Sequence, residues 1–368
     1  MFVFQSKDLP PDPVFPADLE QLGYFINAED QIKMISNPEL VFRFKISTND
    51  RWNEMQREAM NICTREVVLS RLCALGLSIL RLPLDAAPDE PNVPILVSSN
   101  LSTATRVIVV FGEPGQDLGI WAYRTIGRQA IDAGSAVSLA KAVLGGNNMA
   151  GDSAEDRSDT ALILANTGQL IWHCGSATAM TMPTWLALPR KSAVDPPLQM
   201  TYRNKIPHNQ NWQEHVEYVF EQVLAARGKF LKEDAKIDII GLAEGGAGAT
   251  SYLARNWQKW HNHIAAFCLA NPLDYLMPSP MELDTEAVSD SSSTFRAFLS
   301  SRCRAYVLSD EPVDSPMSSG QDQLCNYYSS GESLYAECII PSAWKSMLAW
   351  LDRLHSDPYY EEVELLIQ

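Results

Sequence analysis

The sequence lacks any segment that could cross a membrane. A membrane-spanning helix needs roughly 20 consecutive, mostly apolar residues, and no uninterrupted apolar run in these 368 residues approaches that length. Residues 1–10 contain no basic segment ahead of a longer apolar one, so a secretory signal peptide is not expected. We therefore expect an intracellular protein with no membrane partner, and not a secreted one.

Basic residues are scarce relative to acidic ones. The chain has 29 lysines and arginines against 45 aspartates and glutamates, which gives a formal net charge of −16 at pH 7. Proteins that bind nucleic acids depend on clustered lysines and arginines that displace counterions from the phosphates. A field of the opposite sign should repel RNA and DNA, so direct RNA binding is the less favoured hypothesis, with a local basic pocket left open.

Paired cysteines are also missing. Seven cysteines are scattered along the chain, and no two have the C-x-x-C spacing. Most lie within apolar segments, which predicts reduced, buried thiols. Cys174 and His173 alternate along a predicted strand, which predicts a buried thiol and a half-exposed imidazole. No cluster of histidine and cysteine has ligand spacing, so neither a zinc site nor another metal or cofactor is expected.

A substantial hydrophobic core is present, because 46% of the residues are hydrophobic and only 20% are charged. From residue 106 onward, apolar runs alternate with helical patterns. Strands are expected at 106–112, 161–165, 236–240, 264–270 and 303–308, and helices at 135–144, 211–227, after 241–246 to about 257, and from 342 onward. This alternation predicts an α/β fold with a mostly parallel sheet and helices on both faces.

The N-terminal part shows a different pattern. Residues 1–14 are rich in proline and predict an extended arm. Apolar alternation predicts a hairpin over 23–35 and a third strand at 41–46, and one apolar face over 50–74 predicts a long helix. We expect the hairpin and the long helix to be added at one edge of the α/β unit.

No clean linker divides the remainder, so residues 15–368 are predicted to form a single domain. Residues 181–210 are polar and rich in proline, which suggests a long surface excursion. An acidic, serine-rich insertion at about 276–296 is expected to be mobile.

The most informative motif is a turn where a catalytic serine is expected and an alanine is found. Residues 241–245 read G-L-A-E-G after a short apolar strand, and Gly246 follows at the start of a helix. This is the layout of the nucleophile elbow, G-x-S-x-G, of α/β hydrolases, and the nucleophile position falls on Ala243. A methyl group cannot attack a carbonyl. The same strand–glycine–helix layout also suits a phosphate cradle or plain close packing.

The other groups of a hydrolase triad have predicted positions. The oxyanion loop should be the glycine-rich segment 112–119, and the acid should follow the strand at 303–308, where Asp310, Glu311 and Asp314 lie. The base should be a histidine in the loop 327–341, which contains none. The only late histidine, His355, lies at the end of the final helix. An acid without its serine and its histidine supports no acyl transfer, so no catalytic residue is assigned.

Two glycine-rich loops would form the walls of any surviving pocket, because both leave the C-terminal ends of sheet strands. One is the degenerate elbow, with Gly241, Ala243, Glu244, Gly245 and Gly246, and the other contains Gly112, Glu113, Gly115, Gln116 and Asp117. Glu244 is expected to stabilise a helix N-terminus, and Asp117 to cap a turn or orient a ligand. Either carboxylate could instead be a relocated nucleophile.

Several stretches resemble the Argonaute-binding protein 2 (Arb2) domain family of fungi. The resemblance spans about residues 15–355 and is most specific in V-V-F-G-E-P-G-Q-D-L-G-I-W-A-Y-R at 109–124. Further matching stretches are 15–27, 49–54, 163–172 and 215–220. A similar domain lies at the C-terminus of some fungal class II histone deacetylases.

The resemblance implies a hydrolase-like fold without an intact triad and a role in small-RNA-directed heterochromatin silencing. It implies Argonaute and a second Argonaute-binding subunit as partners, small interfering RNA held indirectly in that complex, and residence in the nucleus and cytoplasm. Chromatin or histone deacetylase complexes and a homodimer are further possible partners.

Three functions from different classes follow. The first is a non-catalytic scaffold or adaptor in Argonaute-dependent silencing. The second is an esterase of the α/β-hydrolase type with a relocated nucleophile. The third is a direct RNA binder, and a dimerisation module associated with a histone deacetylase complex is a variant of the first.

Overall fold

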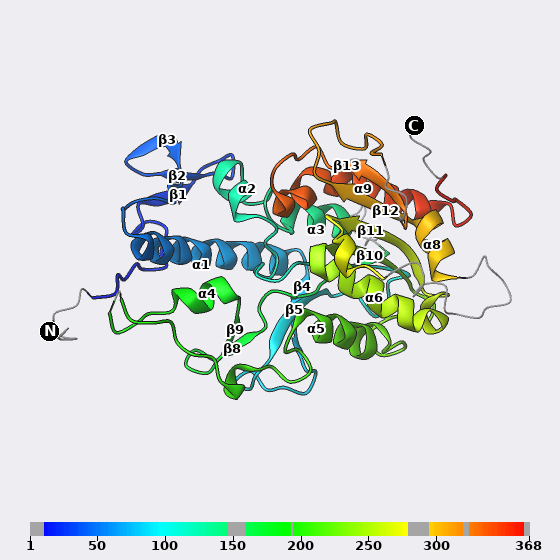
Figure 1. Cartoon of the computed structure of the whole chain (residues 1–368), viewed down its shortest axis with the longest axis horizontal. Coiled ribbons are helices and arrows are strands. Elements are labelled where there is room, and N and C mark those ends of the chain that lie inside the picture. Colours follow the sequence, from blue (N-terminus) through cyan, green and yellow to red (C-terminus); the bar gives the residue numbers. More distant parts are fainter. Residues whose placement is uncertain (1–10, 146–158, 193, 279–293, 319–323, 364–368) are drawn as a thin grey trace.

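The computed structural model describes residues 11–145, 159–192, 194–278, 294–318 and 324–363. The predicted mobile insertion at 276–296 lies mostly outside these described residues, as does most of the N-terminal arm. The fold is built on the predicted α/β plan (Figure 1).

The main sheet has eight strands in the order β13-β12-β11-β10-β6-β7-β5-β4. Their bounds are β4 (Leu77–Leu82), β5 (Val93–Ser98), β6 (Arg106–Phe111), β7 (Thr160–Leu164), β10 (Lys236–Leu242), β11 (Ile264–Ala270), β12 (Cys303–Val307) and β13 (Asn326–Ser329). Every neighbouring pair is parallel except the two that β5 forms with β4 and β7. The predicted mostly parallel sheet is confirmed.

Three of these strands were not predicted. β4 ends just before the proline-rich stretch 83–94 and β5 begins within it, and β13 overlaps the start of the segment 327–341 that was predicted to be a loop. β13 has only four residues, and β5 contains Pro94, a residue that strands disfavour. Their pairing with neighbours, rather than their own sequence, makes them strands.

Helices cover both faces of the sheet, as predicted. The α-helices of the described residues are α1 (Asp50–Ala74), α2 (Tyr123–Arg128), α3 (Val137–Leu144), α4 (Met182–Ala187), α5 (Trp212–Tyr218), α6 (Ala243–Trp260), α8 (Phe295–Arg302) and α9 (Ile339–Ser356). One hydrophobic cluster joins the sheet to α5, α6 and α8, and the other joins it to α1, α3 and α9. Within β6, Val107 and Val109 enter the first cluster and Ile108 and Val110 the second, as the pleat requires.

The N-terminal strands form a sheet of their own. The hairpin of β1 (Tyr24–Ile26) and β2 (Ile32–Met34) is as predicted, but β3 (Asn37–Val41) precedes the predicted strand at 41–46. The alternation of Phe42, Phe44 and Ile46 misled, because only Phe42 is buried. This sheet does not pair with an edge of the main sheet. The 25-residue helix α1, about 37 Å long, runs from it to the edge strand β4 (Figure 1).

The N-terminal arm and the segment 181–210 make contacts that the sequence did not predict. The described end of the arm is anchored, because Asp12 accepts bonds from Arg51 Nη2 at 2.6 Å and from the backbone of Arg190 at 2.9 Å. The segment 181–210 contains α4, whose Trp185 is buried.

The prediction for Cys174 is wrong. The thiol is exposed, as is that of Cys73, whereas the other five cysteines are buried. The strand β8 (Ile171–His173), which pairs with β9 (Thr178–Met180), ends one residue earlier, so Cys174 lies in the turn and not on a strand face.

Candidate functional site

The turn between β10 and α6 has the backbone of a nucleophile elbow. Ala243 is buried and adopts φ of 47°, a left-handed conformation that few non-glycine residues take. A single strained residue between a strand and a helix is what presents the nucleophile in α/β hydrolases. The position at which the sequence lacks a nucleophile is therefore the position at which the backbone is shaped for one.

The glycines of the elbow are needed for close approach. A Cβ on Gly245 would lie 2.2 Å from the carbonyl oxygen of Gly112, and one on Gly241 would lie 2.3 Å from Cα of Gly246. Real Cβ atoms do not approach this closely, so the elbow packs directly on the first residue of the glycine-rich loop. The structure thus brings the two predicted loops together, at contact distance.

Both loops leave the sheet at its switch point. β6 lies between β7 and β10, so the chain proceeds to one side after β6 and to the other side after β7. The crevice outside the carboxyl ends of strands at such a point is where open α/β sheets bind ligands. The location therefore fits a functional site, whatever its chemistry.

The chemistry near Ala243 is acidic. Burial, with a further contribution from Glu244 and Glu337, raises the pKa of Glu113 to about 7. Glu337 lies in the short 3-10 turn η6 (Ala336–Cys338), within the segment where a triad histidine was expected, and is paired with Arg124 at 3.4 Å. An oxyanion hole requires donors aimed at developing negative charge, and three carboxylates at this place oppose that role.

The pH dependence of stability should report Glu113. The folded chain holds this proton more tightly than an unfolded chain, in which the ordinary value is 4.5. The stabilisation is complete below that value and is lost as the pH rises through about 7. Replacing Glu113 with glutamine should therefore raise the free energy of unfolding at pH 8 by about 1–3 kcal/mol. Urea unfolding at pH 5 and 8 measures this. Glu39→Gln, at an exposed position, is the control. If the free energy of unfolding changed equally between pH 5 and pH 8 in the wild type and both variants, the assignment to Glu113 would be wrong.

The predicted acid and base positions hold no triad partner. Asp310, Glu311 and Asp314 are exposed beyond β12, and Asp314 accepts a hydrogen bond from the Tyr306 hydroxyl at 3.1 Å. His355 is exposed at the end of α9. No contact joins any of these four residues to Ala243 or to its neighbours Glu113, Glu244 and Glu337 among the hydrogen bonds and ion pairs of the described residues.

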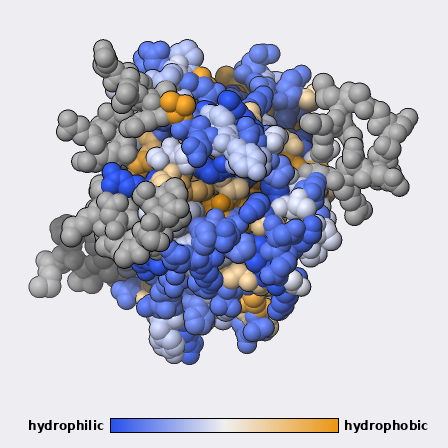
Figure 2. All heavy atoms as spheres, turned by 90° about the vertical axis from the view of Figure 1, so that its right-hand side faces the viewer, coloured by the Kyte–Doolittle hydropathy of each residue, from blue (hydrophilic) through white to orange (hydrophobic). Residues whose placement is uncertain are grey.

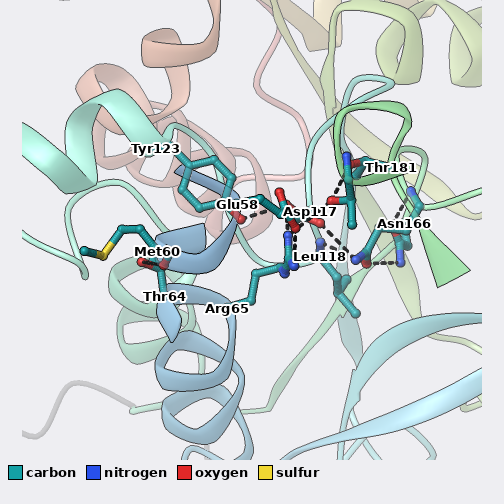
Figure 3. Close-up of polar contacts among 11 residues, drawn as sticks. Glu58, Met60, Thr64, Arg65, Asp117, Leu118, Tyr123, Asn166 and Thr181 are labelled. Atoms are coloured by element: carbon teal, nitrogen blue, oxygen red, sulfur yellow. Dashed lines mark hydrogen bonds and ion pairs between the residues drawn. The ribbon is translucent and has the colours of Figure 1, made fainter. Parts of the chain in front are cut away.

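Asp117 is the centre of a buried polar network (Figure 3). Its Oδ2 accepts hydrogen bonds from Arg65 Nη1 at 3.0 Å and from the Tyr123 hydroxyl at 2.7 Å, and its Oδ1 accepts one from Gln169 Nε2 at 3.0 Å. Arg65 also pairs with Glu58 at 2.8 Å. A carboxylate committed to three donors holds the glycine-rich loop against α1 and is not free to attack a substrate.

The network continues to a histidine that sequence reasoning missed. Gln169 contacts Asn166, whose backbone N–H donates to His215 Nε2 at 3.0 Å, and His215 Nδ1 bonds to Asn209 Oδ1 at 2.7 Å. Burial lowers the pKa of His215 to about 3, so the ring is neutral, accepts through Nε2 and donates through Nδ1. No local signal could have found the contacts that join Asp117 to Arg65 and Gln169, or Asn166 to His215, because these partners are 49 to 52 residues apart in sequence.

The glycine-rich loop lines only a small cavity. About 20 Å³ is enclosed between residues 110–121 and the turn 164–168, which is room for about one water molecule. The hydroxyl of Thr167, in this lining, is buried without a protein partner. None of the elbow residues lines this cavity, since the elbow and the loop touch.

Among the described residues no group of three or more histidine, cysteine, aspartate or glutamate side chains could hold a metal ion. Within the same residues no helix is both long and apolar enough to span a bilayer.

Comparison with known proteins supports the predicted relationship. The Arb2 domain profile matches residues 15–313. Cotranscriptional regulator ARB2A of Mus musculus is 30% identical over 140 residues, and its Homo sapiens counterpart is 30% identical over 142 residues. Each match covers 37% of this chain and 33% of the relative, so the chain spans about a third of the length of these relatives.

Two solved structures have a weaker likeness. A histone deacetylase from Saccharomyces cerevisiae has a TM-score of 0.41 at 13% identity, over 80% of this chain and 98% of that one. A thermostable esterase from Pseudomonas putida has a TM-score of 0.33 at 10% identity, over 84% and 91% of the two chains.

Proposed function

Because this chain belongs to the Arb2 domain family, we propose that it is a non-catalytic scaffold in small-RNA-directed gene silencing. In this role it binds Argonaute together with a second Argonaute-binding subunit and contacts small interfering RNA only through them. The observation that carries the proposal is Ala243: the strained turn of a nucleophile elbow is retained while the nucleophile is absent. We infer that a hydrolase-like fold that lacks its nucleophile acts by binding other proteins through its surface.

Three further observations support this proposal. Asp117 is held by three donors, which removes one of the two candidate replacement nucleophiles. The relatives from mouse and human are named cotranscriptional regulators, which is consistent with work in the nucleus. The net charge of −16 favours protein partners over direct contact with RNA.

The alternative of a relocated nucleophile leaves Glu244, one residue past the elbow. Glu244 lies in the first turn of α6 and is only half-buried. Its neighbour Glu113 has a raised pKa, a feature that active sites share. This is the specific observation that keeps an esterase as the second candidate.

Restoring the serine should not restore hydrolysis. In Ala243→Ser, the hydroxyl would have no histidine to accept its proton, and an unactivated serine is a weak nucleophile. We expect the hydrolysis rate of p-nitrophenyl acetate to stay within about twofold of the wild type. Ala254→Ser, on the same helix, is the matched control. Hydrolysis by the wild type at about tenfold or more above the uncatalysed rate, lost in Glu244→Gln, would establish the esterase alternative.

Affinity purification of the tagged protein from its own cells tests the scaffold itself. Co-purified proteins are identified by mass spectrometry and co-purified RNA by sequencing. Argonaute with duplex small RNA is the expected result. If histone deacetylase subunits were recovered without Argonaute, the protein would be assigned to a chromatin complex of another kind. If neither were recovered, the proposal would be overturned.

A further inference from the structure

Residues 357–363 lie against the surface of the same chain and are held there by hydrogen bonds with its side chains and backbone, as a peptide ligand is held by a receptor. After α9 ends, the segment runs along α8 and the strands β12 and β13, without forming a helix or a strand of its own. Its central anchor is Glu362, whose side chain is only 3% exposed. A glutamate is rarely buried unless its carboxylate is fully paired, so the surroundings of this group are informative.

Four side chains donate to the Glu362 carboxylate. Arg304 binds it with two prongs, from Nε to Oε1 and from Nη2 to Oε2, both at 3.0 Å. The other donors are the Trp350 indole N–H at 3.2 Å, the Tyr360 hydroxyl at 2.8 Å and the Tyr328 hydroxyl. Two-pronged binding by arginine is the strong and specific form of carboxylate recognition. Although burial opposes ionisation, the bonds from Tyr328 and Arg304 keep the pKa of Glu362 below its usual value.

The arginine is itself fixed in place. Its guanidinium lies 4.4 Å from the ring centre of Tyr328 and 5.2 Å from that of Trp350. Side chains on β12, β13 and α9 therefore converge on one carboxylate, and these elements are parts of the rigid sheet and its covering helix. Such a preorganised arrangement recognises a ligand at low entropic cost.

The backbone of the segment is also bound. Arg302 Nη1 donates to the carbonyl oxygens of Pro358 at 3.1 Å and Tyr360 at 2.9 Å. The N–H of Glu362 donates to the Ser301 carbonyl oxygen at 2.8 Å, and Asn326 donates to the Val363 carbonyl oxygen at 2.7 Å. Backbone bonds of this kind bind any sequence, so specificity must come from the side chains.

Only two side chains of the segment are recognised. Besides Glu362, the ring of Tyr360 lies 4.1 Å from the guanidinium of Arg353. The side chain of Tyr359 is 94% exposed and Glu361 is also exposed. The groove therefore selects an aromatic residue, then any residue, then glutamate.

The surface beside this groove is basic, unlike the chain as a whole. A hollow of about 350 Å³ continues from Arg304 and Trp350 along α9 and is lined by Lys345 and Arg353, with Asp314 as the single acid. The neighbouring side of the molecule, at the right of Figure 1, is mostly hydrophilic (Figure 2). Cations concentrated here in a chain of net charge −16 favour an acidic ligand.

We propose that the surface formed by Arg302, Arg304, Asn326, Tyr328 and Trp350 is a docking site for an acidic linear motif of a partner protein. The motif has an aromatic residue two positions before a glutamate. Residues 358–363 are the resident occupant, which the partner displaces. A tethered occupant competes at an effective concentration of the order of millimolar, so the site is closed to weak ligands and open to a partner that is tight or multivalent.

The test uses the full chain and a fluorescent peptide of residues 357–363, with binding read by anisotropy. In the variant Tyr360→Ala/Glu362→Ala, the resident segment loses both recognised side chains. We expect this variant to bind the peptide at least tenfold more tightly than the wild type, because competition is removed. A peptide with Glu362→Gln should bind at least tenfold more weakly, whereas the matched change Glu361→Gln should alter the affinity less than twofold.

A second measurement covers the case in which the double variant does not fold. In the wild type, saturating peptide should speed hydrogen exchange at the Glu362 amide, as displacement breaks its bond to Ser301. Equal affinity of both peptides, or an exchange rate unchanged by peptide, would overturn the proposal. Concentration-dependent dimers that form through exchange of residues 358–363, without peptide binding, would also overturn it, since the ligand would then be a second copy of the chain.

Discussion

Replacing Asp238 with alanine is expected to lower the free energy of unfolding by about 3–5 kcal/mol. Asp238 lies on the central strand β10, is 2% exposed, and pairs with Arg106 of β6 at 2.6 Å. The substitution leaves a buried guanidinium without its main partner, and one of its nitrogens, Nη2, already has no partner. Urea denaturation of both proteins measures the difference.

The same arginine supplies the control. Arg106 also pairs with Asp352 at 2.6 Å, but the side chain of Asp352 is 54% exposed. Because solvent screens that pair, Asp352→Ala should change the free energy of unfolding by no more than about 1 kcal/mol. Similar losses in the two variants would show that burial does not determine how much an ion pair contributes to the free energy of unfolding. Arg106→Met/Asp238→Leu, which removes both charges, should recover much of the loss.

Replacing Gly245 with alanine is expected to destabilise the chain by about 3 kcal/mol, and to do so from the elbow. The added methyl would lie 2.2 Å from the Gly112 carbonyl oxygen and 2.7 Å from that of Phe111. Both are backbone atoms at the end of the central strand β6, so neither can move without disturbing the sheet. Thermal and urea unfolding measure the loss, and hydrogen exchange at residues 110–116 should locate it.

Gly248, one turn further along α6, is the control for this experiment. The three atoms nearest to a methyl there are side-chain atoms of Val216 and Trp212, at 3.1 to 3.2 Å. Alanine also favours a helix over glycine by about 1 kcal/mol, so Gly248→Ala should be close to neutral. If Gly245→Ala lowered the free energy of unfolding no more than Gly248→Ala does, the two loops would not be in tight contact. The gap between them would then have room for a ligand.

Much of the fold was predictable from local patterns. The long apolar runs at 106–112, 236–240 and 264–270 are central strands, because a strand that is buried on both faces has to be apolar throughout. The edge strands β4 and β13 were missed, together with β5, which lies next to the edge between β7 and β4. Strands at or near an edge carry a weaker sequence pattern than central ones. The third N-terminal strand was misplaced for a related reason: alternation at 42–46 did not correspond to burial.

The site divides in the same way. The elbow could be located because its constraints are local, with glycines at fixed spacing around one residue of positive φ. Most partners of Asp117, His215 and Glu362 could not, because they lie between 12 and 58 residues away in sequence; only Tyr123, Asn209 and Tyr360 are nearer. A carboxylate in a list of residues could be a nucleophile, a cap or a structural anchor, and only its contacts distinguish these roles.

By itself, the sequence determined the class of fold, membership of the Arb2 domain family and the loss of the elbow nucleophile. Each depends on residue identity and on short-range spacing. The tertiary structure alone decided that the two glycine-rich loops touch, that Asp117 is committed to a buried network, and that Glu362 occupies a carboxylate site. Those outcomes depend on which distant segments the parallel sheet brings side by side, since packing and electrostatics act over a few ångströms in space and not along the chain.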